Sequence, residues 1–336
     1  MTILSEVTSL DAILGLDLPS ADQAAANAAL ERQNSLTKPP ASLGRLEDLA
    51  VFMASWQGTD RPAIKAAQAV VFAGNHGVCD KGVNPFPQAV TAQMVANFEH
   101  GGAAINQLCR ASGADLSVVA LDLDTPTQDF SEKDAMTEAE VLDAMRRGAE
   151  AVKPDTSVLI LGEMGIGNST IAAALAFAAF GGTAAEWVGR GTGSDEAGKS
   201  LKAQVIEQGV TLHKDAKGLS LLTAIGGREQ AAICGAVLEA RARRIPVILD
   251  GYICTAAVVP LFDANPDLLA HCVVGHVSAE PGHRKLLDAM GKEPILAMNM
   301  ALGEGSGAAL ALGVLRAALE CHNGMATFAE AGVSEA

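Results

Sequence analysis

The sequence predicts an α/β fold, a doubly wound parallel sheet of the Rossmann-like kind with a small helical domain beside it. Two observations lead to this fold class. From about residue 66, short apolar runs rich in β-branched residues alternate with segments of helical periodicity, as expected of buried parallel strands joined by crossover helices. Glycine and polar residues follow nearly every run, where open parallel sheets form their ligand crevice.

The elements follow from this pattern in chain order. Residues 21–33 and 42–56 carry apolar residues at helical spacing, and Ser42 is a candidate N-cap of the second helix. The expected strands lie at residues 69–74, 116–122, 157–162, 246–251, 271–276 and 294–300, and the clearest crossover helices at 137–152 and 228–244. We expect a catalytic α/β domain over residues 59–307, and a small helical domain that combines residues 1–58 with 308–336.

Composition and charge exclude several classes of protein. The 24 basic residues are outnumbered by 39 acidic ones, giving a net charge of −15, so a nucleic-acid binder is not expected. The most apolar run, residues 169–185, is too short and too rich in glycine for a membrane span. The N-terminus lacks the basic region of a signal peptide. Six scattered cysteines without a C-x-x-C pair favour a cytoplasmic protein with reduced thiols.

Two glycine-rich loops are candidates for anion binding. The stretch GEMGIGNST, residues 162–170, enters a helix with Asn168 or Ser169 as the expected cap, and such a turn presents amides and a helix N-terminus to an anion. A plain tight connection is the alternative. The stretch VGRGTGSDEAGKSLK, residues 188–202, places three glycines before a helix that carries Lys202. Neither loop is a P-loop or a complete dinucleotide fingerprint.

Single polar residues leave more than one interpretation open. Glu304 stands between two glycines just before a small-residue helix, so it could be a helix-start acid, a solvated loop residue or a catalytic carboxylate. His76, at a strand end, could equally be a structural histidine. His271 and His276 are five residues apart, which puts them on opposite faces of a strand or helix, so no metal site is expected.

Several segments together resemble the nicotinate-nucleotide–dimethylbenzimidazole phosphoribosyltransferase family over about residues 36–328. They are LTKPPASLGRLEDLA, FAGNHGVCDKGVNPFPQAVTAQMV, GGAAIN, LGEMGIGNST, GRGTG, DGYICTAA, GHVSAEPGH and MALGEGSGAALAL. The chain departs from the family at Ala41, where glycine is common, at Asn84-Pro85, where Ser-Ala is usual, and at Arg228, where an aromatic residue is frequent.

The resemblance implies an activity and its site residues. A homodimer without cofactor or metal would transfer phosphoribose from nicotinate mononucleotide to 5,6-dimethylbenzimidazole, in the assembly of the cobalamin lower ligand. Glu304 would be the base, and Glu163 would stabilise positive charge at C1′. The ribose and nicotinate would contact Gly165, Gly167 and Asn168. The phosphate would be held by amides of the GRGTG and VSAEPGH loops, with Gly191, Gly193, Ser278 and Lys202. The benzimidazole would contact Asn84, Phe86, Pro87, Gln88 and Gln93.

Two other functions remain open from the sequence. A nucleotide-dependent oxidoreductase on a Rossmann sheet is disfavoured by the incomplete dinucleotide fingerprint. A non-catalytic nucleotide-binding module is disfavoured because Glu163 and Glu304 are both present.

Overall fold

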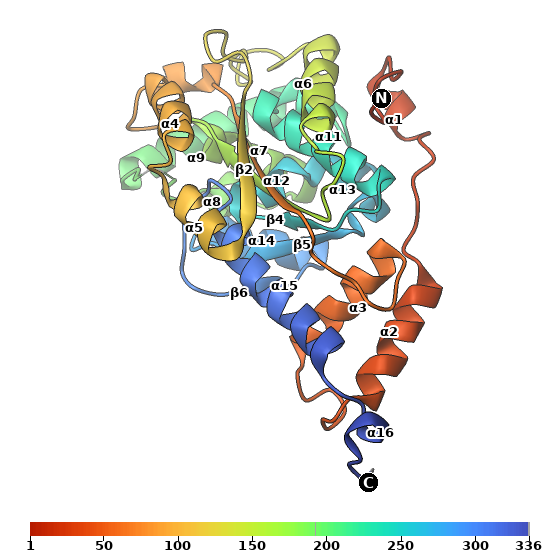
Figure 1. Cartoon of the computed structure of the whole chain (residues 1–336). Coiled ribbons are helices and arrows are strands. Elements are labelled where there is room, and N and C mark those ends of the chain that lie inside the picture. The colour runs from red at the N-terminus through yellow and green to blue at the C-terminus, as the bar shows by residue number, and fades with distance from the viewer. Residues whose placement is uncertain (192, 335–336) are drawn as a thin grey trace.

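A single parallel sheet organises the computed structural model, which describes residues 1–191 and 193–334 (Figure 1). Its six strands run in the order β2-β1-β3-β4-β5-β6, and every neighbouring pair is parallel. The strands are β1 (Ala67–Ala73), β2 (Ala114–Ala120), β3 (Val158–Met164), β4 (Val247–Leu249), β5 (Cys272–His276) and β6 (Pro294–Leu296). The predicted fold class and all six predicted strands are therefore confirmed.

Helices cover both faces of the sheet. The longer ones are α2 (Gln23–Ser35), α3 (Arg45–Gln57), α4 (Ala89–Glu99), α5 (Ala104–Ser112), α6 (Glu138–Glu150), α7 (Asn168–Phe180), α9 (Glu196–Leu212), α11 (Arg228–Ala242), α14 (Pro281–Met290) and α15 (Ser306–Gly324). The short ones are α1 (Leu10–Ile13), η1 (Gly77–Lys81), α8 (Ala184–Trp187), α10 (Ser220–Ala224), α12 (Tyr252–Ala257), α13 (Val259–Ala264), η2 (Pro266–Leu269) and α16 (Phe328–Ala331). Within the residues described, no helix is long and apolar enough to cross a membrane.

Alternate residues of the central strands pack into two separate cores. Phe72 and Leu161 point into the core shared with α6, α7, α11 and α12, whereas Val71 and Ile160 point into the core shared with α3, α5 and α15. Strand side chains alternate between the faces of a sheet, so a continuous apolar run is buried on both sides. This is the physical basis of the doubly wound architecture.

The strand order also fixes where a ligand can bind. From β1 the chain passes first to β2 on one side and then to β3 on the other. Connections that leave in opposite directions open a crevice at the carboxyl ends of the two strands. Glu163 lies at the carboxyl end of β3, in register with Phe72 of β1. It therefore stands at the switch point of the sheet.

The segments outside residues 59–307 divide between two parts of the fold. Leu10 and Ile13 pack into the core beside α6, and the Leu10 amide donates to Glu138 at 2.7 Å. Arg32 of α2 instead donates to the Met325 carbonyl at 2.9 Å, so α2 and α3 lie with the end of α15 in Figure 1. Since α15 begins on the sheet and ends among these helices, the division into two domains stays a prediction.

The Ser42 cap is a wrong prediction. Helix α3 begins at Arg45 after Gly44, whose φ is 51°, and no side chain of the described residues caps it. The turn that follows the two prolines continues to this point, because the Gly44 amide donates to the Ala41 carbonyl at 3.0 Å. Ser42 lies inside this turn and cannot be an N-cap.

Ala41 adopts a left-handed backbone with φ 58°, a conformation that favours glycine. Because the Cβ of an L-residue is strained there, we expect Ala41→Gly to raise the free energy of unfolding by about 0.5–1 kcal/mol. Urea unfolding measures the difference. Ala24→Gly, at an exposed position inside α2, is the matched control and should lower stability by a similar amount. A loss of stability in both variants would contradict the strain at Ala41.

Candidate active site

A cavity of about 260 Å³ lies at the carboxyl ends of the strands. Its walls come from the segments that follow β3, β4, β5 and β6, together with the start of α4. The residues that line it and carry the argument below are Asn84, Phe86, Met94, Glu163, Gly165, Gly167, Asn168, Ser169, Gly191, Asp250, His276, Ser278, Glu280, Leu302 and Glu304. The polar strand-end motifs of the sequence therefore meet in one place.

Three buried carboxylates face this cavity. Glu163, Asp250 and Glu304 are 4%, 1% and 6% exposed. A Cβ at Gly303 would lie only 2.7 Å from Glu163 Oε1, so this glycine lets the Glu163 carboxylate approach the backbone next to Glu304. Buried charges are costly in a protein. A chain that gathers three of them at a switch point has the features of a catalytic site.

The surroundings shift the acidity of these groups. Burial holds the pKa of Glu163 well above its usual range, and the charges of Asp250, Glu229 and Glu304 add to this shift. Asn168 opposes it by donating a hydrogen bond to the Glu163 carboxylate. Burial also raises the pKa of Glu304, while the Ile105 amide lowers it. Glu304 Oε2 has no hydrogen-bond partner among the described residues. It is therefore free to accept a proton from a ligand.

The Glu304 backbone is unusual. Its φ is 64°, in the left-handed region, and Gly303 and Gly305 on either side both have φ 86°. A Cβ at Gly162 of β3 would approach the Glu304 carbonyl oxygen to 2.6 Å. The backbone strain of a non-glycine residue in this conformation is typical of functional positions. The interpretation of Glu304 as a solvated loop residue is wrong, because this side chain is buried.

Asn168 and Ser169 do not cap α7 as predicted. The N-cap is Gly167, with φ 95°, and it makes no side-chain cap bond. Asn168 is the first helical residue, and its side chain turns away from the helix end to donate to Glu163. A left-handed glycine supplies the turn here, so the polar side chain is available for the cavity.

A buried cation lies behind the lining residue Ser169. Lys202 is 2% exposed, and its Nζ lies 3.3 Å from Ser169 Oγ. Burial lowers the pKa of Lys202, and the Glu280 charge opposes that shift. The Gly191 amide donates to Glu280 Oε1 at 3.0 Å. The Gly191 amide, which we expected to donate to phosphate, therefore donates to a carboxylate.

The Ser278 amide is also engaged. It donates to His283 Nδ1 at 2.8 Å, while His283 Nε2 lies 3.2 Å from Thr255 Oγ1. Burial lowers the pKa of His283 to about 3, so the imidazole is neutral and accepts from the amide. Two of the loop amides that we expected to hold phosphate, those of Gly191 and Ser278, therefore have partners within the protein. The Ser278 hydroxyl accepts from the Glu280 amide at 3.2 Å and can still donate its proton to a phosphate.

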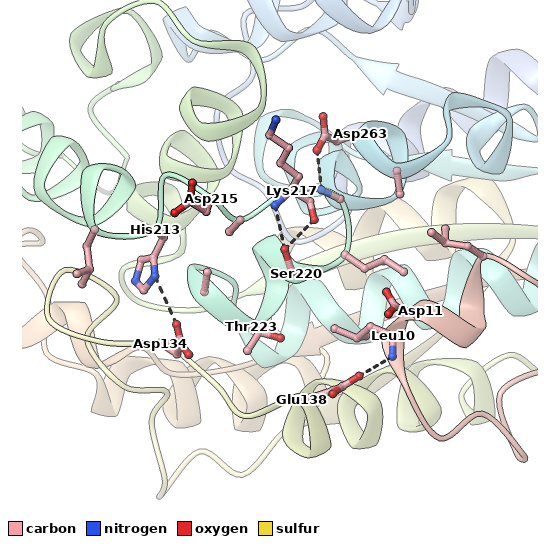
Figure 2. Close-up of a pocket in the computed structure, with 17 residues that line it drawn as sticks. Leu10, Asp11, Asp134, Glu138, His213, Asp215, Lys217, Ser220, Thr223 and Asp263 are labelled. Carbon is pink, nitrogen blue, oxygen red and sulfur yellow. Dashed lines mark hydrogen bonds and ion pairs between the residues drawn. The ribbon is translucent and has the colours of Figure 1, made fainter.

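A second hollow, of about 770 Å³, is lined by a different set of residues (Figure 2). Several of its polar groups pair with one another. The Leu10 amide donates to Glu138, His213 Nδ1 lies 3.4 Å from Asp134, and the Gly218 amide donates to Asp263 at 2.6 Å. Of the predicted site residues, all of which the structure describes, none lines it.

Comparisons with known proteins agree with this geometry. A family described as phosphoribosyltransferase matches residues 18–333. A Rhodobacter capsulatus protein named nicotinate-nucleotide–dimethylbenzimidazole phosphoribosyltransferase is 66% identical over 94% of this chain and 95% of its own. A Ruegeria pomeroyi protein of that name is 55% identical over 99% of this chain and 98% of its own. The crystal structure of CobT from Thermus thermophilus has a TM-score of 0.87 and 38% identity, covering 93% of this chain and 100% of that one.

The chain belongs to this phosphoribosyltransferase family. Most of the residues that the sequence assigned to a phosphoribosyltransferase site line the cavity. They are Asn84, Phe86, Glu163, Gly165, Gly167, Asn168, Gly191, Ser278 and Glu304. Lys202 lies behind Ser169, in hydrogen-bond reach of it.

Besides Lys202, four predicted contacts lie outside the cavity. Pro87 and Gln88 line a neighbouring hollow that shares Asn84 and Phe86, and Gln88 donates to the His76 carbonyl at 3.0 Å. Gln93 is exposed on α4, and Gly193 is exposed in its loop. A helix exposes one face to solvent and presents another to the protein, so α4 supplies Met94 to the cavity in place of Gln93.

Three cavity residues were missed by reasoning from the sequence, namely Asp250, His276 and Glu280. Each follows or ends a predicted strand, so position at a strand end was the available signal. His76, in contrast, packs beneath the 162–170 loop with its Nε2 3.0 Å from Glu229 Oε1, and both side chains are fully buried. The structural interpretation of His76 fits this placement.

Proposed function

We propose that the protein transfers the phosphoribosyl group of nicotinate mononucleotide to 5,6-dimethylbenzimidazole, giving α-ribazole 5′-phosphate and nicotinate in the assembly of the cobalamin lower ligand. One observation carries the proposal. A protein named for this activity is 66% identical over 94% of the chain, and the residues that the reaction needs line one cavity.

The reaction needs one base and no acid. The C1′–N bond to nicotinate breaks, and its electron pair neutralises the pyridinium nitrogen, so the leaving group needs no proton. The benzimidazole nitrogen supplies the electron pair of the new C1′–N bond, and its other ring nitrogen must lose a proton. A monophosphate donor has no departing diphosphate charge, so no metal is required for that purpose.

Glu304 is suited to accept this proton. It is buried, its Oε2 has no partner in the part of the chain that the structure describes, and its raised pKa makes it a stronger base than an exposed glutamate. Glu163 lies beside Gly303 and carries a carboxylate toward the same space. Its raised pKa favours the neutral form in the protein alone. A cationic pyridinium nucleotide beside it would favour the carboxylate, and that carboxylate would stabilise the positive charge that develops at C1′.

The cavity wall offers both kinds of surface that the substrates require. Phe86, Met94 and Leu302 supply apolar surface, which suits a benzimidazole ring. Gly191, Ser278 and the Lys202 behind Ser169 supply polar groups. A phosphate there would gain a buried cation in a chain with net charge −15.

The test is direct. The purified protein is incubated with nicotinate mononucleotide and 5,6-dimethylbenzimidazole. The products are separated by chromatography, and then identified and quantified by mass spectrometry. Equal amounts of nicotinate and α-ribazole 5′-phosphate are expected. Absence of both products with fully folded protein would overturn the proposal. Nicotinate released without the riboside would indicate hydrolysis rather than transfer.

We also infer a homodimer and a cytoplasmic location for this biosynthetic enzyme. Met298 and Leu302 are each 57% exposed in the segment between β6 and α15, and two large apolar side chains so close together favour coverage by another copy. Sedimentation equilibrium should give twice the chain mass of 34.4 kDa. A Met298→Asp, Leu302→Asp variant that stays fully dimeric would place the interface elsewhere, and a monomeric wild type would exclude the dimer.

A further inference from the structure

Asp250 has contacts that the proposed reaction does not use. It follows β4 and is 1% exposed. Its Oδ1 accepts from the Ala308 amide at 2.8 Å, and its Oδ2 accepts from the Gly305 amide at 3.2 Å. Both amides belong to the beginning of α15, and Gly305 directly follows Glu304. The Asp250 carboxylate therefore connects the end of β4, through two hydrogen bonds, to the turn that carries Glu304.

That turn is strained and held from two sides. Glu304 and Gly305 have successive φ values of 64° and 86°. On one side, the Glu304 carbonyl packs so closely on Gly162 of β3 that no side chain fits there. On the other side, the Gly305 amide is bonded to Asp250. A non-glycine residue stays in a sparsely populated conformation only where its surroundings fix it, and Asp250 is one of these two restraints.

The charges around Glu304 come from each neighbouring element. The acidic groups are Asp250 at the end of β4 and Glu163 at the end of β3. The Ile105 amide of α5 donates to Glu304. On β5, His276 Nε2 lies 3.7 Å from Asp250 Oδ1. Burial raises the pKa of Asp250, while His276 and the amides at the start of α15 lower it. These donors and the helix N-terminus favour its ionised form.

We propose that Asp250 is a positioning residue for the transfer reaction, because it fixes the left-handed turn that presents Glu304 to the substrate. This inference rests on the proposed function. The alternative is that Asp250 only stabilises the N-terminus of α15. A purely stabilising carboxylate would affect the free energy of unfolding but leave the kcat of the folded enzyme unchanged, so the two roles predict different values of kcat for folded variants.

The first variant is Asp250→Asn. It keeps the shape but replaces one acceptor oxygen by an NH₂ group that cannot accept from an amide. Hydrogen exchange in peptides that cover residues 302–309 should become at least about tenfold faster, as expected when a hydrogen bond to a charged group is lost. The kcat should fall about 10- to 100-fold with little change in KM for nicotinate mononucleotide.

The pH profile reports the effect of the Asp250 charge on the proposed base. The pKa of Glu304 is raised mainly by burial and lowered by the Ile105 amide. The Asp250 charge has the next largest effect, and it raises this pKa. Removing this charge lowers the pKa of the base. The acid limb of kcat/KM should therefore move to lower pH in Asp250→Asn. An unchanged limb together with unchanged kcat would overturn the proposal.

The matched control is Asp22→Asn. Asp22 caps α2 and accepts from the Ala25 amide at 2.9 Å, so it has the same helix-capping role without facing the cavity. Its variant should keep wild-type kcat and pH profile. If Asp250→Asn does not fold, Asp250→Glu is used, which keeps the charge but displaces the oxygens. Its kcat should fall while the acid limb stays in place, and a wild-type kcat would overturn the proposal.

Failure of the proposed function gives a different result. A wild-type protein without transferase activity would overturn the reaction, but the exchange measurement would still report whether Asp250 holds the turn. Unchanged exchange in residues 302–309 of folded Asp250→Asn would overturn the positioning role whatever the reaction.

Discussion

Glu304→Gln should lower kcat for α-ribazole 5′-phosphate formation by about 100- to 10,000-fold, the usual contribution of a general base. Glutamine keeps the size of the side chain and can accept from the Ile105 amide as glutamate does. It cannot take the benzimidazole proton. Because no role in nicotinate mononucleotide binding is assigned to the Glu304 charge, calorimetry should give nearly unchanged affinity for that substrate.

The pH dependence of the wild type supplies an independent check on the base. Burial raises the pKa of Glu304, and only the ionised form accepts a proton. Activity should therefore be complete above this raised pKa and disappear as the pH falls through it, at a higher pH than for an exposed glutamate. Glu320→Gln is the control, since Glu320 is exposed on α15. Near-normal turnover of Glu304→Gln at neutral pH would exclude Glu304 as the base.

The sheet could be predicted from the sequence because its signals are local. Each strand is a short, mostly apolar run, and in β1 all seven residues are buried. Such runs need no information about distant residues. The C-terminal ends of parallel strands meet by geometry alone, so the convergence of Glu163 and Glu304 could also be predicted.

The errors arise where distant contacts decide the outcome. Asn168 was assigned to a helix cap, but Glu163 competes for its side chain and Gly167 makes the turn. Gln93 was assigned to the wall, but the orientation of α4 about its axis depends on packing and places Met94 there. Asp250 was missed because its role depends on two amides 55 and 58 residues away along the chain.

The segment of residues 188–202, where we expect phosphate to bind, is a further case in which a distant contact decides the outcome. The resemblance to the family implied Lys202 and the glycines, but it could not show that Glu280 accepts from the Gly191 amide. Glu280 Oε2 is buried and has no partner within the described ranges 1–191 and 193–334. Burial raises the pKa of this carboxyl, with the Gly191 amide and Lys202 opposing. A carboxylate thus lies where we expect substrate phosphate to bind.

Lys202→Ala should therefore weaken nicotinate mononucleotide binding by about 10- to 100-fold, the loss expected for a buried charged hydrogen bond. Binding of 5,6-dimethylbenzimidazole should change little, because that ligand has no phosphate. Calorimetry with each ligand alone measures both effects. Lys199→Ala is the matched control on the same helix, since Lys199 is 2.7 Å from Glu196 and pairs with it along the helix surface. Equal weakening for both ligands would contradict the phosphate role.

Glu280→Gln should have the opposite effect. A neutral amide no longer competes with phosphate for Lys202 and the Gly191 amide, so nicotinate mononucleotide should bind more tightly, by up to about tenfold. Inorganic phosphate should likewise become a stronger competitor. Because both side chains act on one anion position, the gain from Glu280→Gln should shrink when Lys202 is already alanine. Additive effects in the double variant, or weaker binding in Glu280→Gln alone, would show that Glu280 organises the loop for phosphate and does not compete with it.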